Sequence, residues 1–450
     1  MSYAREFLSD EERKDPDFKL PLNQAVPLGL QHVLAMFAGN VTVPFIMAGV
    51  LGATHDERVL LVQAAMLVAG VATVIQTVGV GPIGSRLPLV QGTSFGFVPI
   101  LVFIGSAFGA GAVFGTTLIC GLLQMLLGSI VDKVKRFFPP LVSGLVILTI
   151  GLLLMPLALR YLGGHAEPQA LAEVSSWTNI GLGAFTFLLI MFMRLKLSGI
   201  LSLASVFFGL VAGYLVAALV DLLAGTQFVN MENVGRAAWF SLPTPVYWEL
   251  SFPIPAIIAM MIMSVVTTVD TLGSIAGVTM SAADRKPTTR ELRGGILADG
   301  LGTVLAGMFN AFPNTTYNQN VGLVAFTGLM SRHVVTFGAI LLIAAGFVPK
   351  IGAIVSAIPA PVLGGGLIIM FGLVASAGIK LIVAEGFGQR EMMISGISLC
   401  LAIGLSQGGD PLFNNLNLGH YEFLVSSGVI PVTVSAVALN LIMPATESED

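Results

Sequence analysis

Charged residues are scarce in this chain: Asp, Glu, Lys and Arg make up only 10% of its 450 residues, whereas 55% are hydrophobic. A soluble globular protein carries roughly a quarter charged residues, so this composition excludes one large soluble core. The mean hydropathy is +0.90, and apolar runs of about 20 residues, the length that crosses a bilayer, recur along nearly the whole chain. The sequence therefore predicts an all-α polytopic membrane protein embedded in a lipid bilayer.

Cysteines and ligand clusters are scarce as well. Cys120 and Cys400 both lie in apolar runs, which is typical of reduced packing residues rather than of a disulfide. The sequence contains no metal-ligand cluster, nucleophile motif or phosphate-binding loop. We therefore expect a protein that is not an enzyme and has no metal site, no cofactor and no nucleic-acid partner.

The N-terminal residues carry charges of both signs and no hydrophobic stretch, so they do not form a cleavable signal. We expect residues 1–27 to be a cytosolic tail. With the N-terminus inside, all but four of the 21 Lys and Arg residues fall in cytoplasmic segments; the exceptions are Arg58, Arg160, Arg236 and Lys350. This positive-inside bias predicts an integral plasma-membrane protein, inner membrane in a bacterium, with both termini cytoplasmic.

The apolar runs predict fourteen transmembrane segments. They lie near residues 28–51, 60–79, 89–105, 108–129, 139–161, 178–194, 199–223, 254–280, 293–311, 319–331, 334–349, 360–381, 391–407 and 424–444. The third and tenth are too short or too interrupted to cross as complete helices. We expect each of these two to be a half-helix preceded by an extended strand portion.

The two halves of the chain look related. Segment five has Pro140, Gly144 and Gly151, and segment twelve has Pro361, Gly365 and Gly372 at the same spacing. Seven segments separate the two patterns, and because seven is odd the second copy would be inverted in the membrane. We therefore expect a 7+7 inverted repeat, with residues 28–223 as the first copy and 254–444 as the second. Secondary transporters use such repeats to build two alternating faces around a central site.

The two short segments are the candidates for that central site, because discontinuous helices expose backbone groups at the midplane. Residues 87–95 read as an extended stretch that opens into a helix, and the polar residues 313–320 precede a second apolar run. Such backbone is tolerated at membrane depth only inside protein or beside a watery cavity. The two stretches could pair as short strands.

Ionisable residues inside the spans give a second indication. Asp270 and Asp299 are the carboxylates well within the membrane, where a charge costs at least ~3 kcal/mol and is functional by default. Thr267 and Ser274 lie on the same helical face as Asp270, three residues before it and four after it. That face could hold an N–H-bearing ligand, a proton or a sodium ion. Either carboxylate could instead only pair with a hydroxyl network, and His32 in segment one could be a ligand or a structural residue.

The residues of segment ten resemble a known family signature. Gln319, Asn320, Gly322, Thr327 and Gly328 fit the signature of the nucleobase–ascorbate transporter family, which reads Gln/Glu/Pro-Asn-x-Gly, four residues, then Thr and Arg, Lys or Gly. His32, the stretch from Gln91 to Phe95, Asp270 and Asp299 add to the resemblance, which covers essentially all of residues 27–444.

The resemblance implies a core domain of segments 1–4 and 8–11 and a gate domain of segments 5–7 and 12–14. It implies a homodimer that carries uracil, xanthine, urate or a related base together with a proton or sodium ion. The implied substrate-binding residues are Asp270, Gln319, Phe95, Asn320, Gln91 and Ser94, with Phe95 stacking on the base. The implied coupling or supporting residues are Asp299, Ser274, His32 and Thr267, and Gly322, Thr327 and Gly328 complete the signature.

This sequence departs from the family pattern at several positions. The family usually has Glu where this chain has Asp270, and often Asp or His where it has Ser274. Gln319 points toward the xanthine and urate branch, whereas Gly328 leaves out a basic residue found in many members. The alternative function is an anion transporter or exchanger of the same fourteen-segment fold, although Asp270 would repel an anion. A channel or a non-transporting receptor is a third class.

Overall fold

The computed structural model describes residues 8–130, 139–165, 176–229, 231–384, 386–408 and 419–443, and most of these are helical. The first seven residues of the expected tail and the last residue of the expected second repeat lie outside the described residues. So do Lys133, Lys135 and Arg136, three of the basic residues that orient the chain.

The helices and strands follow the expected segments. The first half contains α2 (Asp10–Lys14), α3 (Leu22–Val50), α4 (His55–Val78), β1 (Gln91–Thr93), the 3-10 helix η1 (Phe95–Phe97), α5 (Val98–Phe108), α6 (Ala110–Ser129), α8 (Pro140–Leu162), α9 (Trp177–Lys196), α10 (Ile200–Leu203) and α11 (Ser205–Ala224). The second half contains α12 (Glu232–Arg236), α13 (Ile254–Ala282), α14 (Thr289–Met308), β2 (Asn314–Thr316), α15 (Asn318–Thr327), α16 (Arg332–Gly346), α17 (Pro349–Ser356), α18 (Ala360–Ile382), α19 (Gln389–Gly408), η4 (Gly419–Tyr421), α21 (Glu422–Ser426) and α22 (Val429–Ile442). Each expected segment overlaps one of these helices or one strand–helix pair.

Eight helices in the described part of the chain are long and apolar enough to cross a membrane: α3, α4, α6, α8, α9, α11, α13 and α18. The pair α16 and α17 would make a ninth span, but the two helices meet at 83°. This bend has a local cause, because Pro349 begins α17 and has no backbone N–H with which to continue α16. The protein is thus an integral membrane protein with many apolar helices. The count of fourteen crossings and the inverted repeat stay predictions.

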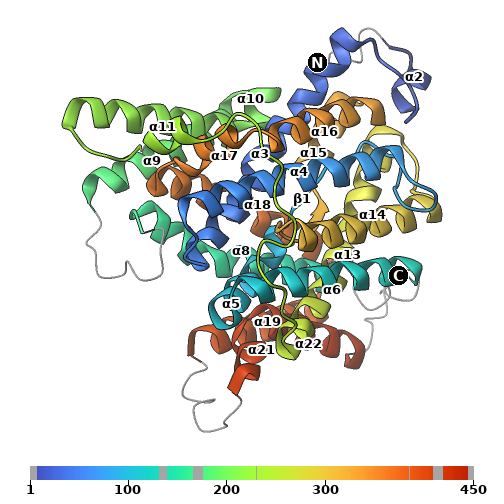
Figure 1. The fold of residues 1–450 in the computed structure, drawn as a ribbon. Helices are drawn as coiled ribbons and strands as arrows, with labels where there is room; N and C mark the ends of the chain where they lie inside the picture. Colours follow the sequence, from blue (N-terminus) through green and yellow to red (C-terminus); the bar gives the residue numbers. More distant parts are fainter. Residues whose placement is uncertain are drawn as a thin grey trace.

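The helices α8 and α18, which carry the matching Pro and Gly spacing, pack directly against each other. A Cβ on Gly144 would lie 2.7 Å from the carbonyl oxygen of Gly378, and one on Gly151 would lie 2.7 Å from the backbone nitrogen of Ala375. Helix backbones approach this closely only where small residues face each other. In Figure 1 the red helices α19, α21 and α22 lie together at one end of the molecule and the green α9, α10 and α11 on another side.

Segments outside the long helices are tied to helix ends. In the N-terminal tail, the carbonyl oxygen of Arg13 accepts from the backbone N–H of Met330 at 2.8 Å, next to the end of α15. The long segment between α12 and α13 runs across the face of the molecule, and Val246 N–H donates to Met308 O at 2.8 Å. These contacts hold the N-terminal tail near the end of α15 and the α12–α13 segment against the end of α14.

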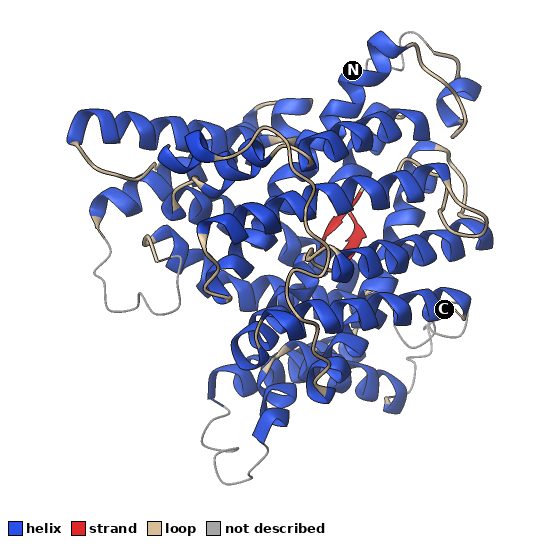
Figure 2. Cartoon of the chain, viewed as in Figure 1, coloured by secondary structure: helices blue, strands red, loops and turns tan. Residues whose placement is uncertain are grey.

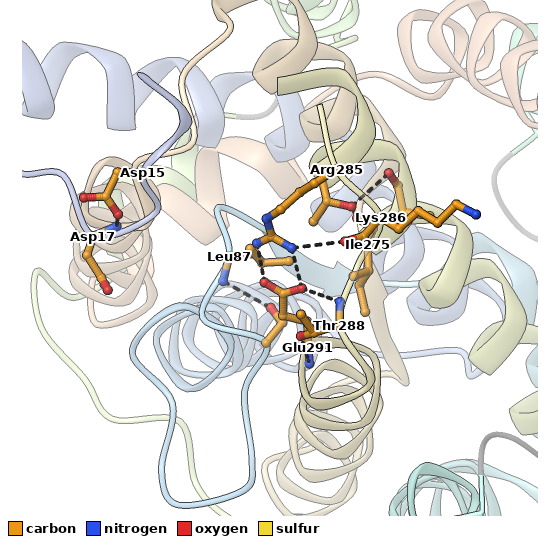
Figure 3. Close-up of polar contacts among 11 residues, drawn as sticks. Asp15, Asp17, Leu87, Ile275, Arg285, Lys286, Thr288 and Glu291 are labelled. Atoms are coloured by element: carbon orange, nitrogen blue, oxygen red, sulfur yellow. Dashed lines mark hydrogen bonds and ion pairs between the residues drawn. The ribbon is translucent and has the colours of Figure 1, made fainter. Parts of the chain in front are cut away.

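The connection from α13 to α14 is closed by an ion pair (Figure 3). Arg285 donates to both carboxylate oxygens of Glu291, at 2.9 and 2.5 Å, and the backbone N–H of Thr288 donates to the same carboxylate at 2.7 Å. Thr288 and Glu291 form a capping box, which satisfies two backbone N–H groups at the start of α14.

Candidate functional site

Two short strands pair side by side near the centre of the molecule, surrounded by helices (Figure 2); we call this pair the strand crossing. β1 and β2 are antiparallel, with Gln91 opposite Thr316 and Thr93 opposite Asn314. The pairing of the two extended stretches, which the sequence suggested, is confirmed. Each strand leads into a short helix, η1 and α5 after β1 and α15 after β2, so both half-helices begin beside the same crossing.

The strands are held together by more than their own ladder. The hydroxyl of Tyr317 donates to the carbonyl oxygen of Thr93 at 2.7 Å, and Asn40 Oδ1 accepts from the backbone N–H of Thr93 at 2.9 Å. Gly92 leaves room for this arrangement, since a Cβ there would lie 2.6 Å from the Tyr317 ring and 2.8 Å from Asn40. The crossing is therefore a packed, fixed element.

A cavity of about 240 Å³ opens at the ends of the two strands. This size lies near the lower end of typical small-ligand pockets, about 300–1,000 Å³. Its walls come from β1 and η1, β2 and α15, and the helices α8, α9, α13 and α18. The lining residues are Thr93, Ser94, Phe95, Gly96, Ile147, Ile150, Arg194, Val266, Thr267, Asp270, Thr315, Thr316, Tyr317, Asn318, Gln319, Leu373, Val374 and Ala377.

Asp270 lies in the cavity wall at the end of a short hydrogen-bond chain through Asn318. Asn318 Nδ2 donates to Asp270 Oδ1 at 3.1 Å, and the hydroxyl of Ser274 donates to Asn318 Oδ1 at 2.7 Å. Asp270 is only partly buried, and its Oδ2 accepts no hydrogen bond from the residues that the structure describes. A carboxylate can accept about four hydrogen bonds, so Asp270 keeps acceptor capacity for a ligand.

Phe95, Ser94, Thr267 and Gln319 also line the cavity. The Phe95 ring makes an edge-to-face contact with Phe371 of α18, with ring centroids 5.6 Å apart and an angle of 86° between the planes. The Ser94 side chain accepts from the backbone N–H of Gly96 and so caps η1. Thr267 accepts from Gln124 Nε2 at 3.0 Å. Gln319 is half-buried and makes no side-chain hydrogen bond to a described residue, so its amide is open to the cavity.

Asp299 of α14 lies elsewhere, beside the paired strands, and the Gln91 side chain of β1 contacts it there. Neither is among the cavity-lining residues, and both are buried. Gln91 Nε2 and the Thr271 hydroxyl each donate to one carboxylate oxygen of Asp299, and Thr316 donates to the first oxygen at 3.4 Å. Since Gln91 belongs to β1 and Thr316 to β2, Asp299 joins both strands to α14.

His32 and Asn320 form a second pair away from the cavity. Asn320 Nδ2 lies 3.1 Å from His32 Nδ1 and donates to the His32 carbonyl oxygen at 2.9 Å. Both residues are buried and neither lines the cavity. A separate space of about 10 Å³ borders His32, close to the volume that one water requires. The pair ties the first turn of α15 to α3.

The rest of the signature, Gly322, Thr327 and Gly328, lies along α15 away from the cavity. The hydroxyl of Thr327 donates to Leu323 O at 3.0 Å. Gly328 has φ +65° and ends the helix in the left-handed conformation that glycine adopts without strain. At 1.5 Å per residue, Gly328 lies roughly 15 Å along the helix from Asn318. This end of the signature therefore shapes the half-helix and does not line the cavity.

Sequence reasoning did not single out Asn318, Tyr317 or Arg194. Asn318 lies directly before Gln319, so its position at the N-terminus of the half-helix could have marked it as a candidate site residue. The Tyr317 hydroxyl donates to the carbonyl oxygen of Thr93 in β1, and no local sequence pattern indicates this bond. Arg194 was counted as a cytoplasmic basic residue at the end of segment six, and only the tertiary structure brings it to the cavity.

Comparisons with known proteins agree with the resemblance. A family model described as Permease family matches residues 23–410. The chain is 34% identical over 424 residues to the uric acid permease PucK of Bacillus subtilis, covering 93% of this chain and 95% of that protein. It is 31% identical over 438 residues to the xanthine permease XanP of Escherichia coli, covering 94% and 93%. These relatives are permeases and not enzymes, as expected.

Solved structures show the same fold at low identity. The transmembrane domain of the cyanobacterial bicarbonate transporter BicA aligns with a TM-score of 0.60 at 15% identity, covering 94% of this chain and 99% of that chain. The murine anion transporter Solute Carrier 26 family member A9, in an inward-facing state, aligns with a TM-score of 0.62 at 11% identity, covering 94% and 69%. At such identities the likeness concerns the fold alone.

Proposed function

The chain belongs to the Permease family, and we propose that within it this protein is a secondary transporter that imports a nucleobase by cation symport. The proposed substrate is an oxopurine such as xanthine or urate, or uracil, and the proposed coupling ion is a proton, with sodium as the other candidate. The protein would work as a homodimer in the plasma membrane, the inner membrane in a bacterium, with both termini cytoplasmic.

One observation carries the substrate assignment: the wall of the cavity offers unused acceptors and donors beside an aromatic ring. No described residue donates to Asp270 Oδ2 or bonds the Gln319 amide, and Phe95 lies in the same cavity. Oxopurines and uracil present alternating N–H and C=O groups along one planar edge. A carboxylate accepts from the N–H groups, an amide both donates and accepts, and an aromatic face covers the ring.

The position of the cavity supports alternating access. Phe95, Asp270 and Gln319 come from segments assigned to the core, whereas Ile150, Val374 and Arg194 come from segments assigned to the gate. A displacement of one set against the other would open the cavity to either side of the membrane. The strand crossing, held by Asp299, would move with the core as a unit.

Asp270 also suggests how a cation could be coupled to the base. When Asp270 is ionised it accepts hydrogen bonds, and when it is protonated one of its oxygens becomes a donor. A base that requires one of these two forms is bound only together with, or only without, the proton. A sodium ion beside the carboxylate would link ion and base binding in the same way.

Transport into proteoliposomes tests this function. Labelled xanthine, urate, uracil and adenine are offered with an inward proton gradient, with a sodium gradient, and with an ionophore that removes the gradient. We expect uptake of at least one oxopurine or uracil that the proton gradient drives and a proton ionophore abolishes. No base uptake above that of protein-free vesicles, together with exchange of bicarbonate or another small anion, would overturn the proposal in favour of the anion transporter.

A further inference from the structure

The cavity wall contains two charged side chains among the described residues, and they come from different sides. Asp270 lies on α13, in the core, and Arg194 lies on α9, in the gate, two residues before the helix ends at Lys196. The other lining residues are polar but neutral, or apolar. A ligand in this cavity of about 240 Å³ therefore has one acidic and one basic residue among those that surround it.

The guanidinium of Arg194 is not used by the fold. Its backbone carbonyl accepts from the Ser202 hydroxyl at 3.1 Å, which fixes the end of α9, but the guanidinium makes no hydrogen bond or ion pair to the residues that the structure describes. Two other arginines differ in this respect: Arg332 pairs with Asp17 at 2.6 Å, and Arg390 donates to Asn440 O at 2.8 Å. Five N–H donors of Arg194 thus remain for a ligand.

We propose that Arg194 is a specificity-determining residue that selects oxygen-rich, anionic purines. Its planar fork would donate to the carbonyl oxygens of the edge opposite the one that Asp270 and Gln319 hold. Arginine suits this task better than lysine, because its paired N–H groups match two neighbouring oxygen acceptors at once. This inference rests on the proposed transport of nucleobases and names the class of base within it.

The charge of Arg194 also removes an electrostatic difficulty. Uric acid is a stronger acid than xanthine and is an anion at neutral pH, so Asp270 alone would repel it. A cationic group on the opposite wall offsets this repulsion in a cavity where water screens charges less than in bulk. A neutral base without carbonyl oxygens, such as adenine, gains nothing from Arg194. Hence Arg194 should increase the preference for urate over adenine more than it increases the preference for xanthine over uracil.

The test measures inhibition of labelled xanthine uptake by unlabelled urate and adenine in proteoliposomes, for wild type, R194Q, R194K and K196Q. Lys196 is a matched control, because it is a basic residue on the same helix end and is exposed, as Arg194 is, but does not line the cavity. In R194Q the urate concentration for half-inhibition should rise roughly tenfold, and that for adenine should change by less than about threefold. R194K should give an intermediate rise for urate, and K196Q should match wild type.

Several outcomes overturn the assignment. If the wild-type protein moves no base, the proposed function itself fails. If the wild type transports xanthine but R194Q shifts urate and adenine equally, or K196Q reproduces the urate shift, Arg194 does not determine specificity. If R194Q is missing from the membrane, R194K keeps the positive charge needed for orientation, and an unchanged urate half-inhibition in R194K refutes the role of the guanidinium.

Discussion

Two carboxylate regions a short distance apart in the structure, one buried and one partly exposed, are built in opposite ways. The Asp299 region lies beside the strand crossing, where Gln91, Thr271 and Thr316 use both oxygens of the carboxylate. The Asp270 region lies in the cavity wall, where Asn318 uses one oxygen and the other accepts nothing from the described residues. Both aspartates satisfy the same sequence rule, a carboxylate inside a span.

The difference shows that hydrogen-bond capacity distinguishes a structural carboxylate from one open to a ligand. A buried acceptor left without a donor costs roughly 1–3 kcal/mol, so a fold retains one only where something else supplies the donor. Around Asp299 the protein supplies every donor. Around Asp270 one oxygen is left for water or for the proposed ligand, so the two residues should respond differently to substitution.

The largest effect is expected at Asp299. Asp299→Leu keeps the branched shape but replaces both oxygens with larger methyl groups, so the Gln91 amide keeps only its bond to Thr316 and the Thr271 hydroxyl loses its acceptor in a dry interior, which should lower stability by about 2–4 kcal/mol. Thermal unfolding in detergent, followed by size-exclusion chromatography, measures the loss, and uptake should fall in parallel with folded protein. Asp299→Asn is the control: its Oδ1 can accept from Gln91 while its Nδ2 donates to Thr271, so it should lower stability less than Asp299→Leu does. Equal stability of wild type and Asp299→Leu would contradict the structural role.

Asp270→Asn should separate transport from stability. The amide can still accept from Asn318 through Oδ1, so the melting temperature should stay close to that of wild type. A neutral amide replaces the free acceptor oxygen with a donor, and base uptake should fall roughly 100-fold, since hydrogen bonds to charged groups contribute about 1.5–3 kcal/mol each. Uptake is normalised to the protein found in the membrane. Normal transport of every tested purine and pyrimidine by this variant would show that the site is elsewhere.

Gln319→Ala tests the amide beside Asp270. Since Gln319 makes no side-chain bond to a described residue, its removal should leave folding unchanged. Loss of a neutral donor and acceptor pair should raise KM for the base roughly tenfold, a smaller effect than at Asp270. Uptake over a range of base concentrations gives KM and the maximal rate separately. The same loss of uptake with a matching fall in folded protein would mean that Gln319 is structural.

Much of this arrangement could be predicted from local sequence. Proline and polar residues at membrane depth predict discontinuous helices, whereas the Gly and Pro spacing of α8 and α18 indicates an inverted repeat and does not predict that the two helices pack together. The roles within the polar set could not be predicted. Gln91 and Asp299 are 208 residues apart in sequence, and only the tertiary fold makes them partners. For this reason Gln91 was expected in the substrate site, whereas the structure places its side chain against Asp299.

Arg194 and the α16–α17 bend show two further limits of sequence reasoning. The positive-inside rule counts Arg194 as a cytoplasmic charge, and no local pattern tells that its side chain reaches a cavity formed by distant segments. The expected segment 334–349 ends where Pro349 stops α16, but the angle at which α17 continues depends on packing against α4. Periodicity sets where helices lie along the chain, and long-range packing sets where their side chains point.

The smallest effect is expected at a third carboxylate, Glu291, outside the membrane segments (Figure 3). Burial alone would raise its pKa, but hydrogen bonds from Arg285 and Thr288 and the Arg285 charge together hold it below the ordinary value of 4.5. Because the folded pKa lies below the unfolded one, this stabilisation is present above about pH 4.5 and is lost as the pH falls through the folded pKa. Glu291→Gln preserves the capping box, so it should cost less than about 1 kcal/mol at pH 7 and nothing at lower pH.

Melting temperatures of wild type and Glu291→Gln at pH 7 and at pH values below 4.5 measure this convergence. Glu232→Gln, in the exposed pair with Arg236, is the matched control and should show a still smaller difference at pH 7. A difference at Glu291 that persists unchanged at the lowest pH would show that packing, and not charge, stabilises this helix start.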